Sequence, residues 1–451
     1  MLIIISDLHL GDSTCGKSIS SDAFYVFVER LDEMAMRASW RSDGSYRPIT
    51  EINILLLGDI IDPLHSTLWL DTEPKTPAYT RPWTDRSKPQ YAAKLKQITR
   101  AILAKNEDSL TALRTAKVEI PRALESQLNW RDDEDLVEVP VNMYYMIGNH
   151  DWYYGIPGLH FDEIRAEVVD ALGLAQSNAP FPYVPEDDPN LAAMLDEYRV
   201  YAVHGDRYDT FNYDPTQKSR IHSGLGDALT VEMLNRFPLE VERQLPDLSK
   251  KVIENFHALS HVRPALATSL WVSSQIKHND LRDEVQNQIK DIWERMGEEF
   301  LALDVVRSFD KKFEFDSVDK LEVALSISKI ASFQTINDIA LWVQEKVWGG
   351  AISYAKYALE EEAFKKRKAN YIVYGHTHHH EIKPLDTEES GDKLGDQVYF
   401  NSGTWHTFFD LAVNKPYEQK FVAYQVSTYL LFYKESERRG HQFETLSGTF
   451  S

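Results

Sequence analysis

Five short clusters of Asp, Asn and His residues are spread over most of the chain, and each follows a short run of aliphatic residues. They are Ser6-Asp7-Leu8-His9, Gly58-Asp59-Ile60-Ile61-Asp62, Gly148-Asn149-His150-Asp151, Val203-His204-Gly205-Asp206 and Gly375-His376-Thr377-His378. Such aliphatic runs are typical of buried strands, and an α/β protein builds its sites where those strands end. The pattern therefore predicts an α/β fold in which the five clusters converge.

The residue types in these clusters favour divalent metal ions. Carboxylate, amide oxygen and neutral imidazole are ligands of Mn, Fe, Zn and Mg, and the clusters offer no thiolate. The structural alternative is that the polar residues only cap strand-to-loop turns. Because five such clusters occur in one chain, we expect instead a centre that holds two divalent ions, with Mn favoured and Fe, Zn or Mg also suitable.

Hydrophobic periodicity places the clusters on elements of secondary structure. Strands are predicted at Leu2 to Ile5, Ile52 to Leu57, Asn142 to Ile147, Arg199 to Val203, Tyr371 to Tyr374 and Val398 to Phe400. Apolar residues recur at helical spacing from Ala23 to Arg37, and a residue of Ser20–Asp22 can cap that helix. Near the C-terminus, Phe421 to Val426 and Tyr429 to Tyr433 predict strands that complete a second sheet.

Two long insertions interrupt this predicted order of strands and helices. The first, residues 63–140, is rich in Pro and Trp before it becomes helical. The second, residues 219–366, is helical by pattern, because apolar residues repeat every three or four positions, as from Leu281 to Phe300. We expect residues 1–218 and 367–451 to form one core and residues 219–366 a helical insert. The insert is either a cap over the site or an oligomerisation surface.

Charge bears on the class of partner. The formal net charge is −21, from 49 Lys and Arg residues against 70 Asp and Glu residues. A surface of this sign repels nucleic-acid backbones over the Debye length, which disfavours indiscriminate binding to DNA or RNA. Bound metal cations reverse the sign locally, so an anionic phosphoester substrate remains compatible with the centre.

The compartment is inferred from cysteine use and from apolar stretches. Cys15 is the only cysteine, which excludes an internal disulfide framework and fits a reducing compartment. The N-terminal run has no basic flank and too few apolar residues for a signal peptide. No stretch approaches the roughly 18 apolar residues of a membrane helix. We therefore expect a soluble, cytoplasmic protein without a membrane partner.

For histidines outside the clusters we expect no part in metal binding or catalysis. His257 and His261 lie four positions apart on a predicted helix, but no carboxylate partner stands out, so a structural role is expected. His379 and His380 extend the last cluster, and we expect them to be exposed neighbours of the site.

The chemistry expected of two adjacent divalent ions is hydrolysis of a phosphate ester. Such a pair holds a bridging hydroxide for in-line attack and clamps the phosphate oxygens. Asp59, at the end of an apolar strand, is the best candidate for the bridging carboxylate. His150 can protonate the leaving oxygen if a carboxylate orients its imidazole, and Asp62 is the natural partner.

These clusters resemble the signature of the calcineurin-like metallophosphoesterase superfamily, which has the same blocks in the same order. The resemblance covers residues 1 to about 62, 142 to about 214 and 371 to about 406. It implies an αββα sandwich of two sheets flanked by helices. It also implies a first metal held by Asp7, His9, Asp59 and His378, and a second held by Asp59, Asn149, His204 and His376. Asn149 and His150 would contact the phosphate, and Asp62 would orient His150.

Two further segments resemble the bacterial branch that includes the diacylglucosamine pyrophosphatases. They are His204-Gly205-Asp206-Arg207-Tyr208-Asp209 and Asn401-Ser402-Gly403-Thr404-Trp405. In this reading Arg207 adds a phosphate contact, although an ion pair with Asp206 or Asp209 is an equal alternative. The chain departs from that branch in its two long insertions, and in having Asn149-His150 where the lipid pyrophosphatases have Asn-Arg.

Three functions remain open on the sequence. The first is a phosphoesterase acting on a phosphomonoester, a phosphodiester or a diphosphate. The second is a DNA or RNA nuclease of the same superfamily, with a partner subunit supplying contacts that the acidic chain lacks. The third is a catalytically silent scaffold, whose mark would be lost ligands, and no ligand is lost here.

Overall fold

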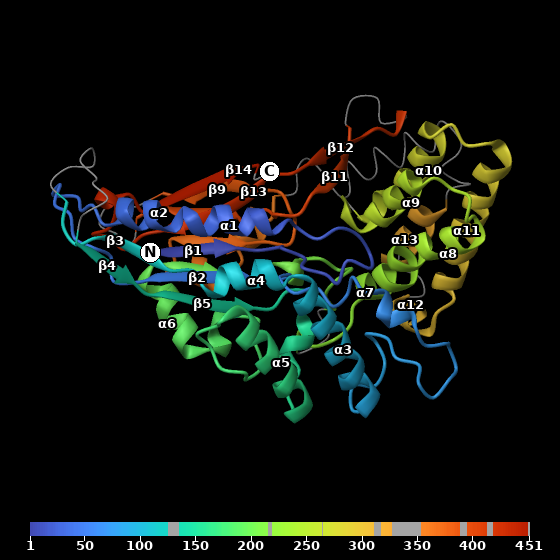
Figure 1. Ribbon diagram of the computed structural model, residues 1–451, viewed down its shortest axis with the longest axis horizontal. Helices are drawn as coiled ribbons and strands as arrows, with labels where there is room; N and C mark the ends of the chain where they lie inside the picture. Colours follow the sequence, from blue (N-terminus) through green and yellow to red (C-terminus); the bar gives the residue numbers. More distant parts are fainter. Residues whose placement is uncertain are drawn as a thin grey trace.

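A computed structural model describes residues 1–124, 135–214, 219–263, 265–310, 317–326, 353–387, 395–412 and 418–449. Within these ranges the fold is of the mixed α/β kind, with helices on both sides of central sheets (Figure 1). The larger sheet has the strand order β14 (Phe443–Gly448), β13 (Ser427–Phe432), β1 (Leu2–Ile5), β2 (Ile52–Leu57) and β5 (Val141–Met146). Strands β1, β2 and β5 run parallel, while β13 and β14 run antiparallel to their neighbours.

The central strands are buried on both faces, which explains their uninterrupted apolar sequences. Successive side chains of a strand point to opposite faces, so Ile3 and Ile5 pack on one side of β1 while Leu2 and Ile4 pack on the other. The side chains of strand β2 alternate between the two faces in the same way. The predicted strands are present, with end points that shift by at most two residues from those expected. The two C-terminal strands do not complete the second sheet, however, because β13 pairs with β1 of the larger sheet and β12 (Phe421–Tyr424) pairs with β11 (Phe408–Leu411) in a separate small sheet.

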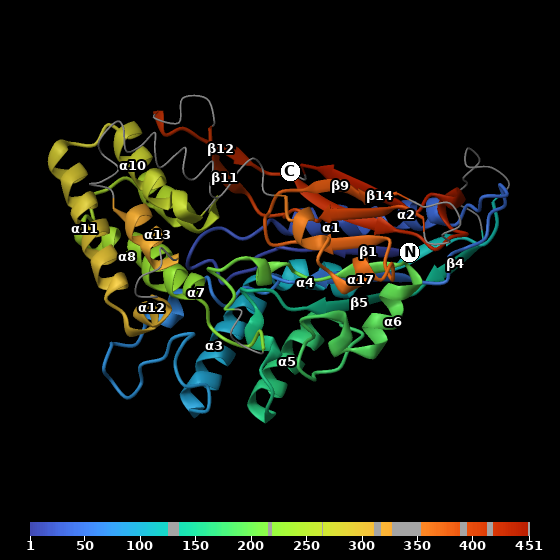
Figure 2. The same ribbon diagram turned by 180° about the vertical axis from the view of Figure 1, so that it is seen from behind.

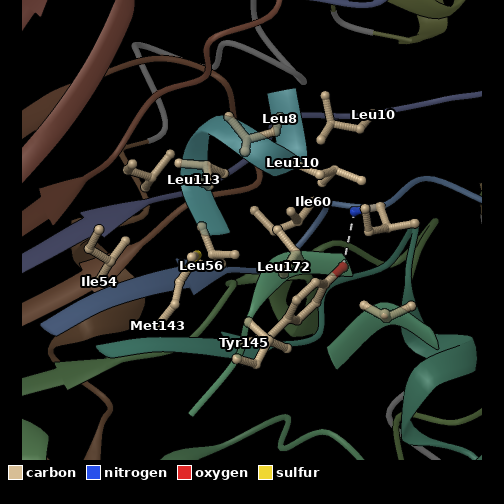
Figure 3. Packing of buried hydrophobic residues seen from close by; sticks show 14 of the residues in the cluster. Leu8, Leu10, Ile54, Leu56, Ile60, Leu110, Leu113, Met143, Tyr145 and Leu172 are labelled. Atoms are coloured by element: carbon tan, nitrogen blue, oxygen red, sulfur yellow. Dashed lines mark hydrogen bonds between the residues drawn. The ribbon is translucent and has the colours of Figure 1, made fainter. Parts of the chain in front are cut away.

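One face of the larger sheet is covered by helices. These are α1 (Ser21–Glu29), α2 (Leu31–Ala38), α3 (Pro89–Lys105), α4 (Glu107–Arg114) and α5 (Leu159–Leu172). Figure 3 shows Leu110 and Leu113 of α4 close to Leu56 of β2 and Met143 of β5. The Tyr145 hydroxyl in this layer accepts a hydrogen bond of 3.0 Å from the Ile61 N–H, which ties β5 to the loop after β2.

The second sheet has the strand order β6 (Val200–Ala202), β8 (Tyr371–Tyr374), β10 (Gln397–Asn401) and β9 (Glu381–Asp386). It packs on the free face of the larger sheet, since Val373 and Phe400 share a buried cluster with Leu2 and Leu55. Helix α6 (Pro189–Glu197) closes that interface with Leu191 and Leu195. On the outer face lie α16 (Ala355–Ala358) and α17 (Glu362–Lys365), visible in Figure 2 beside the sheet.

The described helices of residues 219–326 form a second hydrophobic core, whereas α16 and α17, which also fall within the predicted insert of residues 219–366, pack on the second sheet. The helices of this core are α7 (Leu225–Leu229), α8 (Arg236–Gln244), α9 (Lys250–His257), α10 (Thr268–His278), α11 (Asp283–Leu301), α12 (Asp304–Phe309) and α13 (Ser317–Leu325), with a π-helical segment at Thr230–Asn235. Both views show this group of helices at one end of the sheets (Figures 1 and 2). We refer to residues 219–326 as the helical insert.

A small sheet connects the helical insert to the core. Its strand order is β12 (Phe421–Tyr424), β11 (Phe408–Leu411) and β7 (Val262–Arg263). Strand β7 belongs to the insert and pairs parallel to β11, with Val262 opposite Phe409 and Arg263 opposite Asp410. This pairing carries residues of the insert to the ends of the core strands.

Some elements differ from the sequence-based expectation. The helix expected over Ala23–Arg37 is two helices that meet at Arg30, and the Ser20 hydroxyl caps the first of them by accepting from the Asp22 N–H. A short ribbon of β3 (Val118–Pro121) and β4 (Leu136–Val139) was not expected inside the first insertion. In the described part of the chain, none of the helices combines the length and apolar character needed to cross a membrane.

Candidate metal centre

The five clusters lie where the core strands end. Asp7 and His9 follow β1, Asp59 and Asp62 follow β2, and Asn149 and His150 follow β5; His204 follows β6, and His376 and His378 follow β8. Pairing continues beyond the strands, since Leu10 forms a parallel bridge with Ile61. The structure therefore brings the predicted side chains together from residues far apart in sequence.

The backbone at these positions is strained. Positive φ angles occur at Asp7 (53°), His9 (44°), Asp59 (55°), His376 (67°) and His378 (63°). A left-handed conformation costs a non-glycine residue roughly 1–2 kcal/mol, so it persists only where surrounding contacts hold it. Here the Asp7 and His9 N–H groups donate to the carbonyls of Gly58 and Asp59, at 3.1 and 2.9 Å. The strain turns the side chains of consecutive motif residues toward one point.

Two glycines allow the loops to approach one another. A Cβ atom at Gly58 would lie 2.5 Å from Nδ1 of His204, and one at Gly148 would collide with the Asp59 carboxylate. Both glycines directly precede a predicted ligand, so the small residue is required by the close packing of the ligands themselves.

The first group of possible ligands consists of Asp7, His9 and His378, all buried. Nε2 of His378 lies 3.5 Å from Oδ1 of Asp7 and 3.0 Å from Nε2 of His9. Nδ1–H of His9 donates to Asp62, so its Nε2 carries a lone pair that points at His378. Two nitrogen atoms that face one another in this way require a cation or a proton between them.

The second group consists of Asp59, His204 and His376, with Asn149 among them. Oδ1 of Asn149 lies 3.2 Å from Nε2 of His204 and 2.9 Å from Nδ1 of His376. Nδ1–H of His204 donates to the Leu57 carbonyl at 3.0 Å, which directs Nε2 into the group. Nε2–H of His376 donates to Asp209 at 3.1 Å, which leaves the lone pair of Nδ1 free for a ligand bond.

Asp59 lies between the two groups. Its Oδ2 is 3.2 Å from Nε2 of His204 and 3.8 Å from Nε2 of His9, while its Oδ1 accepts from the His150 N–H at 2.8 Å. The carboxylate is buried and contacts ligands of both groups. It occupies the position from which one side chain can bridge two ions.

The electrostatics of the centre fit divalent cations. Burial raises the pKa of Asp7 to about 6, and neither Asp7 nor Asp59 forms a described ion pair with Lys or Arg. Burial lowers the pKa of His9 to about 3, and it lowers the pKa of His378 well below its ordinary value, so both imidazoles are neutral and can donate a lone pair. Buried carboxylates need a counter-charge, and the facing oxygen and nitrogen atoms supply a hard-to-borderline donor set for one. The side chains could thus hold a metal ion.

Asp62 organises a third group with three histidines. Its Oδ2 accepts from Nδ1–H of His9 at 2.8 Å, of His65 at 2.7 Å and of His150 at 3.0 Å. Burial disfavours the charged form of His150, but the negative charges of Asp62 and Asp59 outweigh it and raise the His150 pKa to about 9. His150 is therefore protonated at neutral pH and presents Nε2–H away from Asp62.

Several residues near the centre were not given a role from the sequence. His65, three positions after Asp62, and Asp209, five after His204, orient or extend the predicted set. Asp151 stabilises the loop by accepting from the Ile60 N–H at 2.9 Å and from the Tyr145 hydroxyl at 2.7 Å. Arg263 comes from the helical insert, and its Nη2 lies 3.1 Å from Nε2 of His378. Only the spacing of His65 from Asp62 offered a signal that sequence reasoning could have used.

Arg207 has a partner other than those considered from the sequence. Its guanidinium pairs with Glu361, while Asp206 pairs with Arg220 and Asp209 with His376. Tyr208 and Tyr374 donate to the same Glu361 oxygen, at 2.6 and 2.8 Å. Arg207 thus forms an ion pair, which was one of its two alternatives, but its partner is Glu361 and neither Asp206 nor Asp209; the phosphate contact stays a prediction.

The positions of the remaining histidines are consistent with the expectation that they do not bind metal. His379 and His380 are exposed. Helix α9 ends at His257, and a 3-10 turn, Ala258–His261, follows it, so His257 and His261 do not share a helical face. Neither belongs to a possible ligand group among the described residues. The ring of His261 instead lies 4.1 Å from that of His406.

Comparison with known proteins identified no relative of this chain. A scan against models of protein families gave no match, and a search among curated proteins found no relative.

Proposed function

We propose that this chain is a metal-dependent phosphoesterase with a dinuclear centre, of the calcineurin-like metallophosphoesterase type. The observation that supports it most directly is the position of Asp59, whose Oδ2 lies 3.2 Å from His204 and 3.8 Å from His9 and so between two ligand groups. A pair of divalent ions that shares a ligand is characteristic of enzymes that displace groups at phosphorus.

The arrangement of layers supports the same proposal. Helices cover one face of the larger sheet, the second sheet covers its other face, and short helices lie outside the second sheet. This order of layers is what the αββα sandwich of that superfamily requires. Each of its ligand blocks is also filled in this chain, which speaks against a silent scaffold.

The residues divide between two ions in the proposed centre. Asp7, His9, Asp59 and His378 would hold the first, and Asp59, Asn149, His204 and His376 the second. Because the donors are carboxylate, amide and imidazole, Mn is favoured and Fe, Zn and Mg are also suitable. When bound, the ions supply Lewis-acid activation of water and of the phosphoryl oxygens.

His150 is the proposed proton donor. Asp62 holds its Nδ1–H at 3.0 Å and stabilises the charged ring, so that Nε2–H is available to the leaving oxygen. Once His150 has given up that proton, Asp62 keeps the neutral ring in the same orientation. The Asn149 side chain stands beside it and would contact the phosphate as well as a metal.

The proposed substrates are a phosphomonoester, a phosphodiester or a diphosphate. The test is hydrolysis by metal-stripped protein refilled with manganese, using para-nitrophenyl phosphate, bis-para-nitrophenyl phosphate and a single-stranded DNA oligonucleotide. D59N removes the bridging charge and is expected to abolish turnover. D43N, at an exposed carboxylate outside the centre, is the matched control and should retain wild-type activity.

The outcomes separate the candidate functions. Hydrolysis of either small ester that D59N loses and D43N keeps would support the phosphoesterase. Cleavage of DNA alone would favour the nuclease. Failure to bind manganese and to cleave any of the three substrates would contradict the proposal.

A further inference from the structure

Arg263 reaches the metal centre from the helical insert. It is the last residue of β7, and Val262 beside it is buried in the hydrophobic core of the insert. Parallel pairing with Asp410 of β11 fixes the backbone of Arg263 at the junction of insert and core. Its position is therefore determined by two packed units and not by a free loop.

One side of the Arg263 guanidinium is held by backbone atoms. Nη1 donates to the carbonyls of Ser260 at 2.8 Å and Val262 at 3.1 Å. The other nitrogen, Nη2, donates to Nε2 of His378 at 3.1 Å. The arginine is thus pre-oriented, with one edge directed at a proposed metal ligand.

Arg263 differs from other arginines of the insert in its partners. Arg236, Arg243 and Arg295 each pair with a glutamate on the helices. Within the described ranges no carboxylate lies within ion-pair distance of Arg263. The nearest negative charges are those of Asp7, Asp59, Asp410 and Asp62, which act on it through space.

The lone pair of His378 cannot serve two partners. A neutral imidazole nitrogen has one lone pair, and at Nε2 it accepts either from Arg263 or binds a metal ion. Ions in the centre would also neutralise Asp7 and Asp59, the charges that now favour the guanidinium. A cation with a free N–H group beside divalent ions is stable only if an anion lies between them.

We propose that Arg263 binds a nonbridging oxygen of the substrate's phosphoryl group, so that the helical insert supplies part of the phosphate-binding site. This inference rests on the proposed phosphoesterase function. It makes a terminal, doubly charged phosphoryl group the preferred ligand, because its second negative charge strengthens the charge-assisted hydrogen bond from Nη2. A phosphodiester offers only two nonbridging oxygens and one negative charge.

The test compares R263Q with R295Q, which removes an arginine from the exposed surface of the same insert. Each protein is refilled with manganese, its metal content is measured, and binding of inorganic phosphate is followed by titration calorimetry. R263Q should retain the metals and bind phosphate about 10- to 100-fold more weakly than wild type, which is the effect of losing a charge-assisted hydrogen bond. R295Q should match wild type in both measurements.

A second variant guards against misfolding. R263M keeps the methylene packing of the half-buried side chain without its charge, and it should show the same loss of phosphate affinity. Phosphate affinity within twofold of wild type, in either variant with its metals retained, would overturn the proposal. Loss of metal or of the fold in both variants would also overturn it, because Arg263 would then support the fold or the metal centre instead.

The phosphate titration is independent of turnover. If wild type hydrolyses none of the esters yet binds phosphate through Arg263, the proposed function fails and the phosphate site stands. If wild type hydrolyses esters and R263Q binds phosphate normally, only the assignment of Arg263 fails. Absence of phosphate binding by metal-loaded wild type would overturn the assignment as well.

Discussion

A single carboxylate oxygen orients three imidazoles at the centre. Because Oδ2 of Asp62 accepts from His9, His65 and His150, one side chain fixes the tautomers of a proposed metal ligand and of the proposed proton donor together. Orientation of ligating histidines by carboxylates is a common determinant of metal affinity. In the proposed mechanism Asp62 would therefore couple metal binding to proton transfer, whereas His150 would serve proton transfer alone.

Because of this difference between His150 and Asp62, H150Q and D62N should have different effects on manganese binding. H150Q should retain manganese and lower the rate of ester hydrolysis about 10²- to 10⁴-fold, since it removes the proton donor. D62N should lower the rate too, and should also weaken manganese binding by about 10- to 100-fold, because a neutral amide orients and polarises His9 less strongly than a carboxylate. Manganese content after dialysis and rates at saturating manganese measure the two effects. Equal manganese affinity in D62N and wild type would contradict the coupling.

Asp227 predicts a pH dependence of stability. This buried carboxylate of α7 accepts from Trp152 Nε1–H at 3.0 Å and from the Ser223 hydroxyl at 2.8 Å, and burial raises its pKa to about 6. A raised pKa in the folded state means that the stabilising contribution is complete below the unfolded value of 3.8 and is lost as pH rises through 6. The charged carboxylate therefore destabilises the fold at neutral pH.

D227N should remove that dependence. Its free energy of unfolding relative to wild type is expected to rise by roughly 2–3 kcal/mol between pH 4 and pH 7, the value of a shift of about two pKa units. Urea unfolding of wild type and D227N at both pH values, with a chelator present to remove metal ions, measures the difference. A difference that stays constant with pH would show that Asp227 has an ordinary pKa in the fold.

At the level of single residues, the ligands could be predicted but some of their partners could not. Strongly apolar strands closely precede Asp7, Asp59 and His204. These side chains come together because the strands end at the same edge of the sheets. Arg263 lies some 115 positions from His378, which it contacts. Its place depends on how the insert packs against the core, and no local pattern encodes that packing.

The elements that attach the insert to the core carry buried polar groups. Arg81 of the first insertion donates to Glu232 of the π-helical segment at 2.7 Å, and Asn235 of the same segment donates to the Leu64 carbonyl at 2.9 Å. All six residues of that segment are buried. Wider turns of this kind often occur at functional positions, and here one turns polar side chains toward the core.

Breaking the buried ion pair should be costly. R81M leaves the Glu232 carboxylate buried with only Arg236 nearby, at 3.7 Å, and is expected to lower the free energy of unfolding by about 3–5 kcal/mol. The double variant R81M/E232L should recover most of the loss. R100M, at an exposed pair with Glu167, is the control and should lower the free energy of unfolding far less than R81M does, because solvent screens exposed ion pairs. Urea unfolding curves measure all three, and a loss in R81M no larger than in R100M would contradict the prediction.

Elements were easier to predict than their connections. Strands β1, β2 and β8 have the predicted bounds, because a strand buried on both faces is apolar throughout. Strands β9 and β12 carry mostly exposed residues, and β7 is only two residues long. Of these, β12 was found from its aromatic run, whereas β7 and β9 have no hydrophobic signal and form by pairing with a neighbouring strand.

On the scale of the whole molecule, the centre joins both sheets and the insert. Each ligand group draws on loops from β1 or β2 of the larger sheet and from β6 or β8 of the second sheet. An ion bound there links the two sheets and offsets the repulsion between buried carboxylates. Metal binding and global stability should therefore be linked.

Removal of the metals should destabilise the whole fold. Manganese at about 100 times its dissociation constant is expected to add roughly 2.7 kcal/mol per site to the free energy of unfolding, because ions bind the folded chain only. Thermal unfolding with manganese and with a chelator measures the shift in Tm. D59N should show little of this shift, and an equal Tm for wild type under both conditions would contradict the expected linkage.

The order of the ligands along the chain has a consequence for synthesis. His9 and His378 face one another although 369 positions separate them. At about 5–20 residues per second, a ribosome needs roughly 20–75 seconds to travel from the first to the second. During that interval the nascent chain carries only part of the proposed metal site, so the proposed hydrolysis of phosphate esters would begin only after His378 has been synthesised.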